Sequence, residues 1–180
     1  MKNPRDIGRR IAFAGVGSAI SLIFVTLAYF VSNMSLSFYV LSSVGIMLPL
    51  TQNYYREGVL ASVAVSVIGF FIANLKIIPF AMASGFYVVF AVFWHNKNFN
   101  RWLGYAIKFL YSGLVFFILY KLTSLFTVDL SNLPKIAALP YAASYAIFNV
   151  IFSLAFIVYD ILVEQGYIYL NKFVVKKIKR

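Results

Sequence analysis

Two carboxylates four residues apart are the first side chains in this sequence whose types and spacing could do chemistry. Asp160 and Glu164 lie near the end of a long apolar run, and the i, i+4 spacing places both on one face of a helix. Such a pair suits a proton or cation site, or a latch for a partner. We expect instead plain charge pairing with arginines that flank other apolar runs, because carboxylates at a membrane boundary can reach such arginines. Those arginines are Arg9, Arg10, Arg56 and Arg101.

Other reactive groups are scarce. The chain has no cysteine and a single histidine, His95, which excludes a thiol nucleophile, a disulfide framework and the usual histidine-rich metal sites. The sequence has no HExxH, Walker A, GxGxxG or GxSxG motif. We therefore expect a protein that is not an enzyme, has no metal and no cofactor, and leaves any ATP hydrolysis to partner subunits. His95 follows Trp94 at the end of an apolar run and is expected to be an interfacial residue.

The composition is that of an integral membrane protein. Of the 180 residues, 62% are hydrophobic and only 12% are charged, which is about half the charged share of a typical soluble domain. The formal net charge of +11 does not indicate nucleic-acid binding, because the basic residues lie at the termini and in short turns between apolar runs. That placement is typical of a multi-pass protein and suits contact with anionic membrane lipids.

Six apolar runs predict six membrane-spanning helices. The first, Ile11–Val31, has 21 residues without charge or proline, and at about 1.5 Å per residue it spans about one hydrocarbon core. The second and third runs are short, so we expect one of them to be tilted, broken or partly re-entrant. The other predicted spans are Ser37–Leu50, Gly58–Ala73, Ile77–Trp94, Trp102–Leu125 and Leu139–Val163.

An even number of spans places both termini on the same side of the membrane. Twelve of the sixteen Lys and Arg residues then share the side of the termini and three fall on the other, with Lys108 set aside. The positive-inside rule makes the termini cytoplasmic. We predict one six-helix transmembrane bundle over residues 1–165 and a basic amphipathic cytoplasmic tail over residues 166–180 that lies on the membrane surface.

Two lysines fall inside the fifth run. Lys108 is seven residues into it, and a charge inside a span is a functional candidate by default. Because this position is near the end of the run, we expect the long stem to carry the amine to the cytoplasmic headgroups. Lys121, nearer the other end, either reaches outward in the same way or faces an outer cavity.

Polar residues gather at the predicted outer ends of the spans. Together with the many Phe and Tyr rings they have the make-up of a small-molecule site, which is apolar with a few orienting polar groups. They equally suit ordinary loop and cap positions. The candidate solute-binding residues are Asn33, Asn74, Lys76, Lys121, Asp129, Asn132, Tyr145 and Asn149.

Small residues crowd the first half of the first span. Gly15 and Ala19 are four residues apart and Ala12 lies one turn earlier, so the three share one side of a helix. Small-xxx-small spacing lets a second helix approach closely in lipid. This face either packs inside the bundle or docks a separate membrane protein.

Several segments carry a family likeness: RRIAFAGVGSAISLI, GIMLPLTQNYYREGVLASVAVSVI, SGFYVVFAVFW and WLGYAIKFLY. With the six short spans, the cytoplasmic termini and the basic tail, they resemble the substrate-binding S components of energy-coupling factor (ECF) transporters. The likeness is greatest to uncharacterised S-component-like membrane proteins of Gram-positive bacteria. This resemblance covers most of the chain and concerns the pattern of hydropathy and residue types.

The resemblance implies a bacterial cell-membrane subunit that captures a vitamin or other small solute at its outer face. Delivery would then use a membrane coupling subunit and two ATPase subunits. It implies docking through Ala12, Gly15 and Ala19, where the family carries an Ala-x-x-x-Ala stripe; here Val16 stands four residues after Ala12. The alternative is a non-transporting scaffold subunit of a cell-envelope complex, such as the rod-shape cell-wall machinery, which would use the same small-residue face and basic tail.

Overall fold

The computed structural model describes residues 4–97, 101–125 and 141–178, and every regular element within these ranges is helical. The elements η1 and η2 are short 3-10 turns, and η3 is a π-helical stretch that leads directly into α4. The predicted all-α class is therefore confirmed for the described chain. In order, the elements are α1 (Pro4–Phe30), η1 (Ser32–Met34), α2 (Ser35–Leu50), α3 (Tyr55–Ala73), η2 (Asn74–Ile77), η3 (Phe80–Phe86), α4 (Tyr87–Asn96), α5 (Arg101–Leu125) and α7 (Tyr141–Ile178).

Within the described residues, four helical stretches are long and apolar enough to cross a membrane, which agrees with the predicted class of membrane protein. They are Asp6–Phe30, Tyr55–Ile77, Trp102–Lys121 and Tyr145–Val174. Two shorter apolar helices, Ser35–Leu50 and Phe80–Asn96, lie between them in the sequence. That these two also span, and that the termini are cytoplasmic, stay predictions.

The ends of the helices lie near the ends of the predicted apolar runs, but some differ by a few residues. α3 begins at Tyr55, three residues before the predicted start at Gly58, and with η2 it forms an apolar stretch of 23 residues. The third segment is therefore long enough to span. Its extra turn contains Glu57, whose charge near a helix N-terminus is favoured by the helix dipole. α2 stays short at 16 residues.

The last helix is longer than the predicted sixth span. α7 has 38 residues and continues without a break across Gly166, where we predicted that a separate tail begins. The alternating apolar and basic residues after Gly166 thus form the final turns of α7. That these turns lie on the membrane surface stays a prediction. The predicted start of this span at Leu139 lies outside the described residues.

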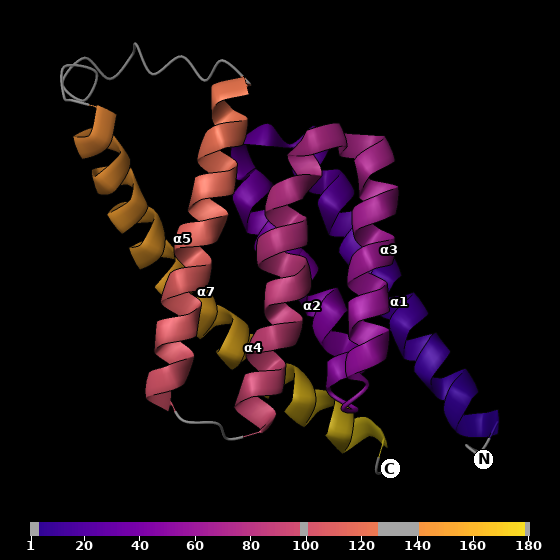
Figure 1. The fold of residues 1–180 in the computed structure, drawn as a ribbon. Coiled ribbons are helices and arrows are strands. Elements are labelled where there is room, and N and C mark those ends of the chain that lie inside the picture. Colours follow the sequence, from indigo (N-terminus) through magenta and orange to yellow (C-terminus); the bar gives the residue numbers. More distant parts are fainter. Residues whose placement is uncertain (1–3, 98–100, 126–140, 179–180) are drawn as a thin grey trace. The chain divides into compact units, whose positions relative to one another are not determined.

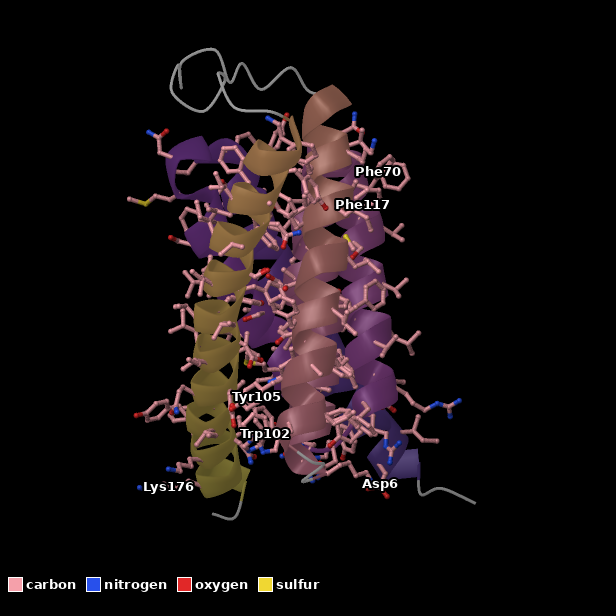
Figure 2. All side chains as sticks on the ribbon, turned by 60° about the vertical axis from the view of Figure 1, so that its left-hand side comes forward. Asp6, Phe70, Trp102, Tyr105, Phe117 and Lys176 are labelled. Carbon is pink, nitrogen blue, oxygen red and sulfur yellow. The ribbon has the colours of Figure 1, made fainter. Side chains whose placement is uncertain are left out.

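The chain divides into two compact units. Unit 1 comprises Met1–Asn98 and Ile161–Arg180, and unit 2 comprises Phe99–Asp160, so α7 contributes to both. In unit 1 the helices α1 to α4 run side by side (Figure 1). Asp6 and Lys176, near the start of α1 and the end of α7, lie at the same end of unit 1, whereas Phe70 lies at the other end (Figure 2).

Within unit 1, α1 and α2 approach each other at backbone distance. A Cβ atom added at Gly17 would clash with the Gly45 carbonyl oxygen, and one added at Gly45 would clash with Gly17 and Ser21. Beside this crossing the Ser21 hydroxyl donates a hydrogen bond of 2.7 Å to the Ser42 carbonyl oxygen. The crossing therefore requires glycine on both helices.

Buried hydroxyl groups connect the π-helical stretch η3 to α2. The Ser84 hydroxyl donates to the Tyr39 carbonyl oxygen at 2.7 Å, and the Tyr39 hydroxyl donates to the Lys76 carbonyl oxygen at 2.7 Å. Tyr39 thereby joins α2 to both η2 and η3. Fully buried apolar side chains fill the space between these elements, among them Val25, Ile46, Leu50, Val65, Phe80 and Tyr87.

Candidate functional site

A line of polar and aromatic side chains joins α5 to the first part of α7 in unit 2. On α5 its members recur every fourth residue, which places them on one helical face. On α7 the members recur every three or four residues. Because the two helices are antiparallel, the first members on α5 contact the last members on α7. We call this contact the α5–α7 seam. It comprises Lys108, Ser112, Phe116 and Tyr120 on α5, and Tyr145, Asn149, Ser153, Phe156 and Asp160 on α7.

An ion pair closes one end of the seam. The Lys108 Nζ atom donates to the Asp160 Oδ2 atom at 2.7 Å, and the two side chains are only 17% and 10% exposed. Both residues lie inside stretches that are long and apolar enough to span a membrane. Burying two charges is costly, and their mutual attraction offsets that cost only in close geometry such as this.

Hydroxyl and amide groups continue the seam beyond the ion pair. The hydroxyl oxygens of Ser112 and Ser153 are 3.2 Å apart, and the Asn149 Oδ1 atom lies 3.4 Å from the Ser153 hydroxyl. Ser112 also donates to the Phe109 carbonyl oxygen at 2.8 Å. Each hydroxyl has one proton, so Ser153 is left to donate either to Ser112 or to Asn149. Such contacts hold helices together in lipid.

Aromatic rings close the other end of the seam. Tyr145 packs against Phe116 and Tyr120, with ring centroids 5.2 and 5.3 Å apart. Phe116 also packs against Phe152 at 5.5 Å. These separations are those of favourable edge and tilted ring contacts. Hence the seam is charged at one end, neutral and polar in the middle, and aromatic at the other end.

The expected partners of the two carboxylates are corrected by these contacts. We expected arginines, but Asp160 pairs with Lys108, and Glu164 lies 2.8 Å from the His95 Nδ1 atom. Arg10, one of the expected arginines, bonds Glu57 instead at 3.4 Å. Likewise the expected reach of Lys108 to the headgroups is not what the structure shows. Because α5 and α7 are antiparallel, the Asp160 carboxylate lies beside the Lys108 amine. Each charged group therefore has a partner of opposite charge.

A second polar network lies in unit 1, where α7 meets the ends of α2 and α4. The Asn96 amide nitrogen lies 2.8 Å from the Tyr167 hydroxyl oxygen and 2.9 Å from that of Tyr55. Tyr55 in turn donates to the Asn53 side-chain oxygen at 3.1 Å. Asn53 has a φ of 58°, in the left-handed region that asparagine tolerates. The network thus fixes the turn between α2 and α3.

Asn96→Leu is expected to destabilise unit 1 by about 1–3 kcal/mol, because it leaves two tyrosine hydroxyls without their amide donor. Thermal unfolding of the protein in mild detergent measures this loss. Lys97→Gln, a change at the next and exposed position, is the control and should leave the unfolding temperature unchanged. An equal loss in both variants would show that the amide is not the cause.

Sequence reasoning missed this role of Asn96. Three asparagine or tyrosine side chains contributed by separate helices have no common spacing in the sequence. The one available signal was the NYY segment in a turn, because asparagine in turns adopts the left-handed conformation.

The predicted solute-binding residues of unit 1 lie at the end of the unit that carries η1 and η2. Asn33 is an exposed residue of η1, and Asn74 is an exposed residue at the start of η2 with a φ of 53°. The Lys76 amine lies 5.5 Å from the centre of the Tyr29 ring, within the range of a cation–π contact. The structure thus brings these three residues to the same end of unit 1.

The predicted solute-binding residues of unit 2 are only partly described. Tyr145 and Asn149 belong to the α5–α7 seam. Lys121 is exposed, and its amine lies 6.0 Å from the centre of the Phe117 ring. Asp129 and Asn132 lie outside the described residues.

The predicted docking residues of α1 face outward. Ala12, Gly15 and Ala19 are exposed, whereas Gly17 is buried against α2. A Cβ atom added at Gly15 would have no other atom within 4 Å. The sequence left open whether the small residues of α1 pack inside the bundle or dock another protein. Among them, Gly17 packs inside the bundle against α2, and Gly15 does not take part in that contact.

Metal ligands do not converge in the described part of the chain. No group of three or more His, Cys, Asp or Glu residues is placed to hold a metal ion within residues 4–97, 101–125 and 141–178. The two close carboxylates, Asp160 and Glu164, each bind a basic side chain. Their polar contacts include an ion pair with Lys108 and a hydrogen bond with His95.

Comparisons with known protein families, with curated proteins and with solved structures find no match to this chain. The likeness to S components therefore remains a resemblance of sequence texture. The function proposed below takes its support from the contacts and exposures just described and from that resemblance.

Proposed function

We propose that this chain is a multi-pass membrane subunit of the S-component type, which binds a vitamin or other small solute and works with an ATP-driven partner module. In this proposal all six apolar helices span a bacterial cytoplasmic membrane and both termini are cytoplasmic. The solute binds at the outer end, near Asn33, Asn74 and Lys76. Chemical energy comes from the partner ATPase subunits.

The observation that carries this proposal is the outward face of α1. Gly17 lies at the close crossing with α2, whereas Ala12, Gly15 and Ala19 are exposed, and a Cβ atom added at Gly15 would meet no described atom within 4 Å. Small residues on a lipid-facing surface let another helix approach closely. Ala12 and Gly15 lie in the half of α1 nearer its N-terminus and Ala19 lies just past its middle, away from the polar end with η1 and η2. This separation along α1 supports the proposal of one surface for a membrane partner and another for a solute.

Gly15→Leu and Ala19→Leu are expected to abolish recovery of an ATPase module with the tagged protein in mild detergent, because leucine blocks close helix approach. A retained small solute, detected by native mass spectrometry, should be unaffected. Ile23→Leu, on the same exposed side of α1 but one turn beyond Ala19, is the control.

Three results would contradict this function. Loss of partner and solute together would mean that the face has a structural role. Recovery of the ATPase module with both variants would mean that the face is not used. Recovery of cell-wall proteins with no ATPase module and no solute would favour the scaffold alternative.

A further inference from the structure

Exposed basic side chains collect at one end of unit 1, around the turn between α2 and α3. The Arg9 Nη2 atom donates to the Gln52 Oε1 atom at 3.3 Å, which places the start of α1 against this turn. The Asn96 amide contacts the Tyr55 and Tyr167 hydroxyls, which places the end of α4 and the last part of α7 there as well. We call this surface the basic end. Its exposed cations are Arg9, Arg56, Lys97, Lys172 and Lys176.

The charges of the basic end are not compensated by ion pairs within the part of the chain that the structure describes. The contacts with carboxylates there use three other basic side chains, Arg10, His95 and Lys108. The hydrogen-bond partner of Arg9 is Gln52, a neutral amide. Like charges gathered at one end of a protein repel one another, and bound anions relieve that repulsion. The structure thereby separates the cations that favour an external anion from those held in internal contacts.

Each cation of the basic end lies at or beside the end of an apolar helical stretch. These stretches are Asp6–Phe30, Tyr55–Ile77, Phe80–Asn96 and Tyr145–Val174. Large apolar side chains are exposed within one turn of the cations. Ile11, two residues after Arg9, is 66% exposed, and Leu60, one turn after Arg56, is 65% exposed. A rim of cations that borders exposed apolar surface matches the boundary between the phosphate groups and the acyl chains of a bilayer.

We propose that the basic end binds the phosphate groups of anionic phospholipids and thereby selects these lipids over zwitterionic ones. Arg9 and Arg56 each present a planar guanidinium group, which can donate two hydrogen bonds to one phosphate. The lysines add compact point charges. One cation close to an anionic membrane surface strengthens binding about fivefold. Several cations at one end of the same unit therefore give the protein a marked preference for anionic lipid.

The last turns of α7 favour a lipid surface over an acidic protein as the partner. Tyr169 is 70% exposed and Phe173 is 60% exposed, and Lys172 lies between them in the sequence. Aromatic rings beside cations are typical of residues at the level of the headgroups. An acidic protein surface would match the charges, but it would leave the apolar surface beside them uncovered. A bilayer covers both, because its phosphate groups and acyl chains are adjacent.

Lipid selection at the basic end goes beyond the proposed solute binding. The candidate solute residues of unit 1, Asn33, Asn74 and Lys76, lie at the end with η1 and η2. Figure 2 labels Asp6 at the basic end of this unit and Phe70 at the other end. Loss of lipid selection would leave solute binding intact, and a protein that binds no solute would still select lipids. Each inference can therefore fail without the other.

Competition between two lipids tests the proposal. The full chain is placed in vesicles with equal amounts of phosphatidylglycerol and phosphatidylcholine and extracted in mild detergent, and the retained lipids are quantified by mass spectrometry. The wild-type protein should retain phosphatidylglycerol in excess. The triple variant Arg9→Gln, Arg56→Gln and Lys172→Gln should lower the ratio of the two lipids at least about fivefold. Lys76→Gln removes a charge at the other end of unit 1 and should leave the ratio unchanged.

Thermal unfolding gives a second measurement, because a lipid that binds only the folded protein stabilises it. Phosphatidylglycerol should raise the unfolding temperature of the wild type above its value in phosphatidylcholine, and should do so less in the triple variant. The variant should match the wild type in phosphatidylcholine alone, which shows that it folds. Equal retention of the two lipids by the wild type, an unchanged ratio in the triple variant, or an equal fall in Lys76→Gln would each overturn the proposal. An unchanged ratio together with loss of a co-purified protein would assign the basic end to a protein partner instead.

Discussion

Gly17→Leu is expected to prevent unit 1 from folding, or to destabilise it by about 3 kcal/mol or more. Overpacking a closely packed site ordinarily costs about 1–3 kcal/mol. Here even a Cβ atom meets the backbone oxygen of Gly45, which cannot rotate away as a side chain can. α1 and α2 would have to separate, and the hydrogen bond from Ser21 to Ser42 would be lost with their contact. The amount of monodisperse protein and its unfolding temperature in mild detergent measure the effect.

Gly15→Leu is the matched control for this result. It makes the same chemical change two residues away on the same helix, at a position with no atom within 4 Å of an added Cβ. Its unfolding temperature should stay within the error of the wild-type value. Equal destabilisation by both substitutions would mean that α1 and α2 do not cross at Gly17 and Gly45.

Lys108→Leu is expected to destabilise the protein by about 3–5 kcal/mol, because it removes the cationic member of the buried ion pair with Asp160. Asp160→Leu should cost less, since the free Lys108 amine can reach the headgroups. The double variant with leucine at both positions should lie within about 1 kcal/mol of the wild type, because an apolar pair can replace a buried ion pair.

Reversible unfolding in bicelles measures all three free energies of unfolding in one series. Ser112→Ala, which removes a seam hydroxyl but no charge, is the control and should cost only about 0.5–1.5 kcal/mol. Equal losses from the two single leucine variants would show that Lys108 has no alternative position. A double variant as unstable as Lys108→Leu would show that the charges are needed for folding itself.

Much of the helical architecture could be predicted from the sequence. Long apolar runs without charge can satisfy their backbone groups in lipid only as helices, so α1, α3, α5 and α7 follow closely from Ile11–Val31 and its counterparts. The ends were less certain. α3 begins inside the polar TQNYYRE segment and α7 runs past Gly166, because the helical backbone continues through polar residues wherever no proline or unfavourable cap stops it.

The sequence identified residues of the candidate site but did not predict which of them contact one another. The sequence singles out Lys108 and Asp160 as charges inside apolar runs, but 52 residues separate them, and no spacing rule pairs residues on different helices. It also identifies the small residues of α1 without distinguishing Gly15 from Gly17. Their roles differ because the side of α1 that meets α2 depends on how both helices rotate to bury their surfaces.

The sequence by itself therefore determined the composition, the helical class and the membrane character of this protein, since these follow from local properties of each run. Tertiary structure alone decided which groups meet: Lys108 with Asp160, His95 with Glu164, and Gly17 with Gly45. The physical reason is that helix formation is governed by near neighbours, whereas the pairing of charges and the closest backbone approach depend on the packing of helices distant in the chain.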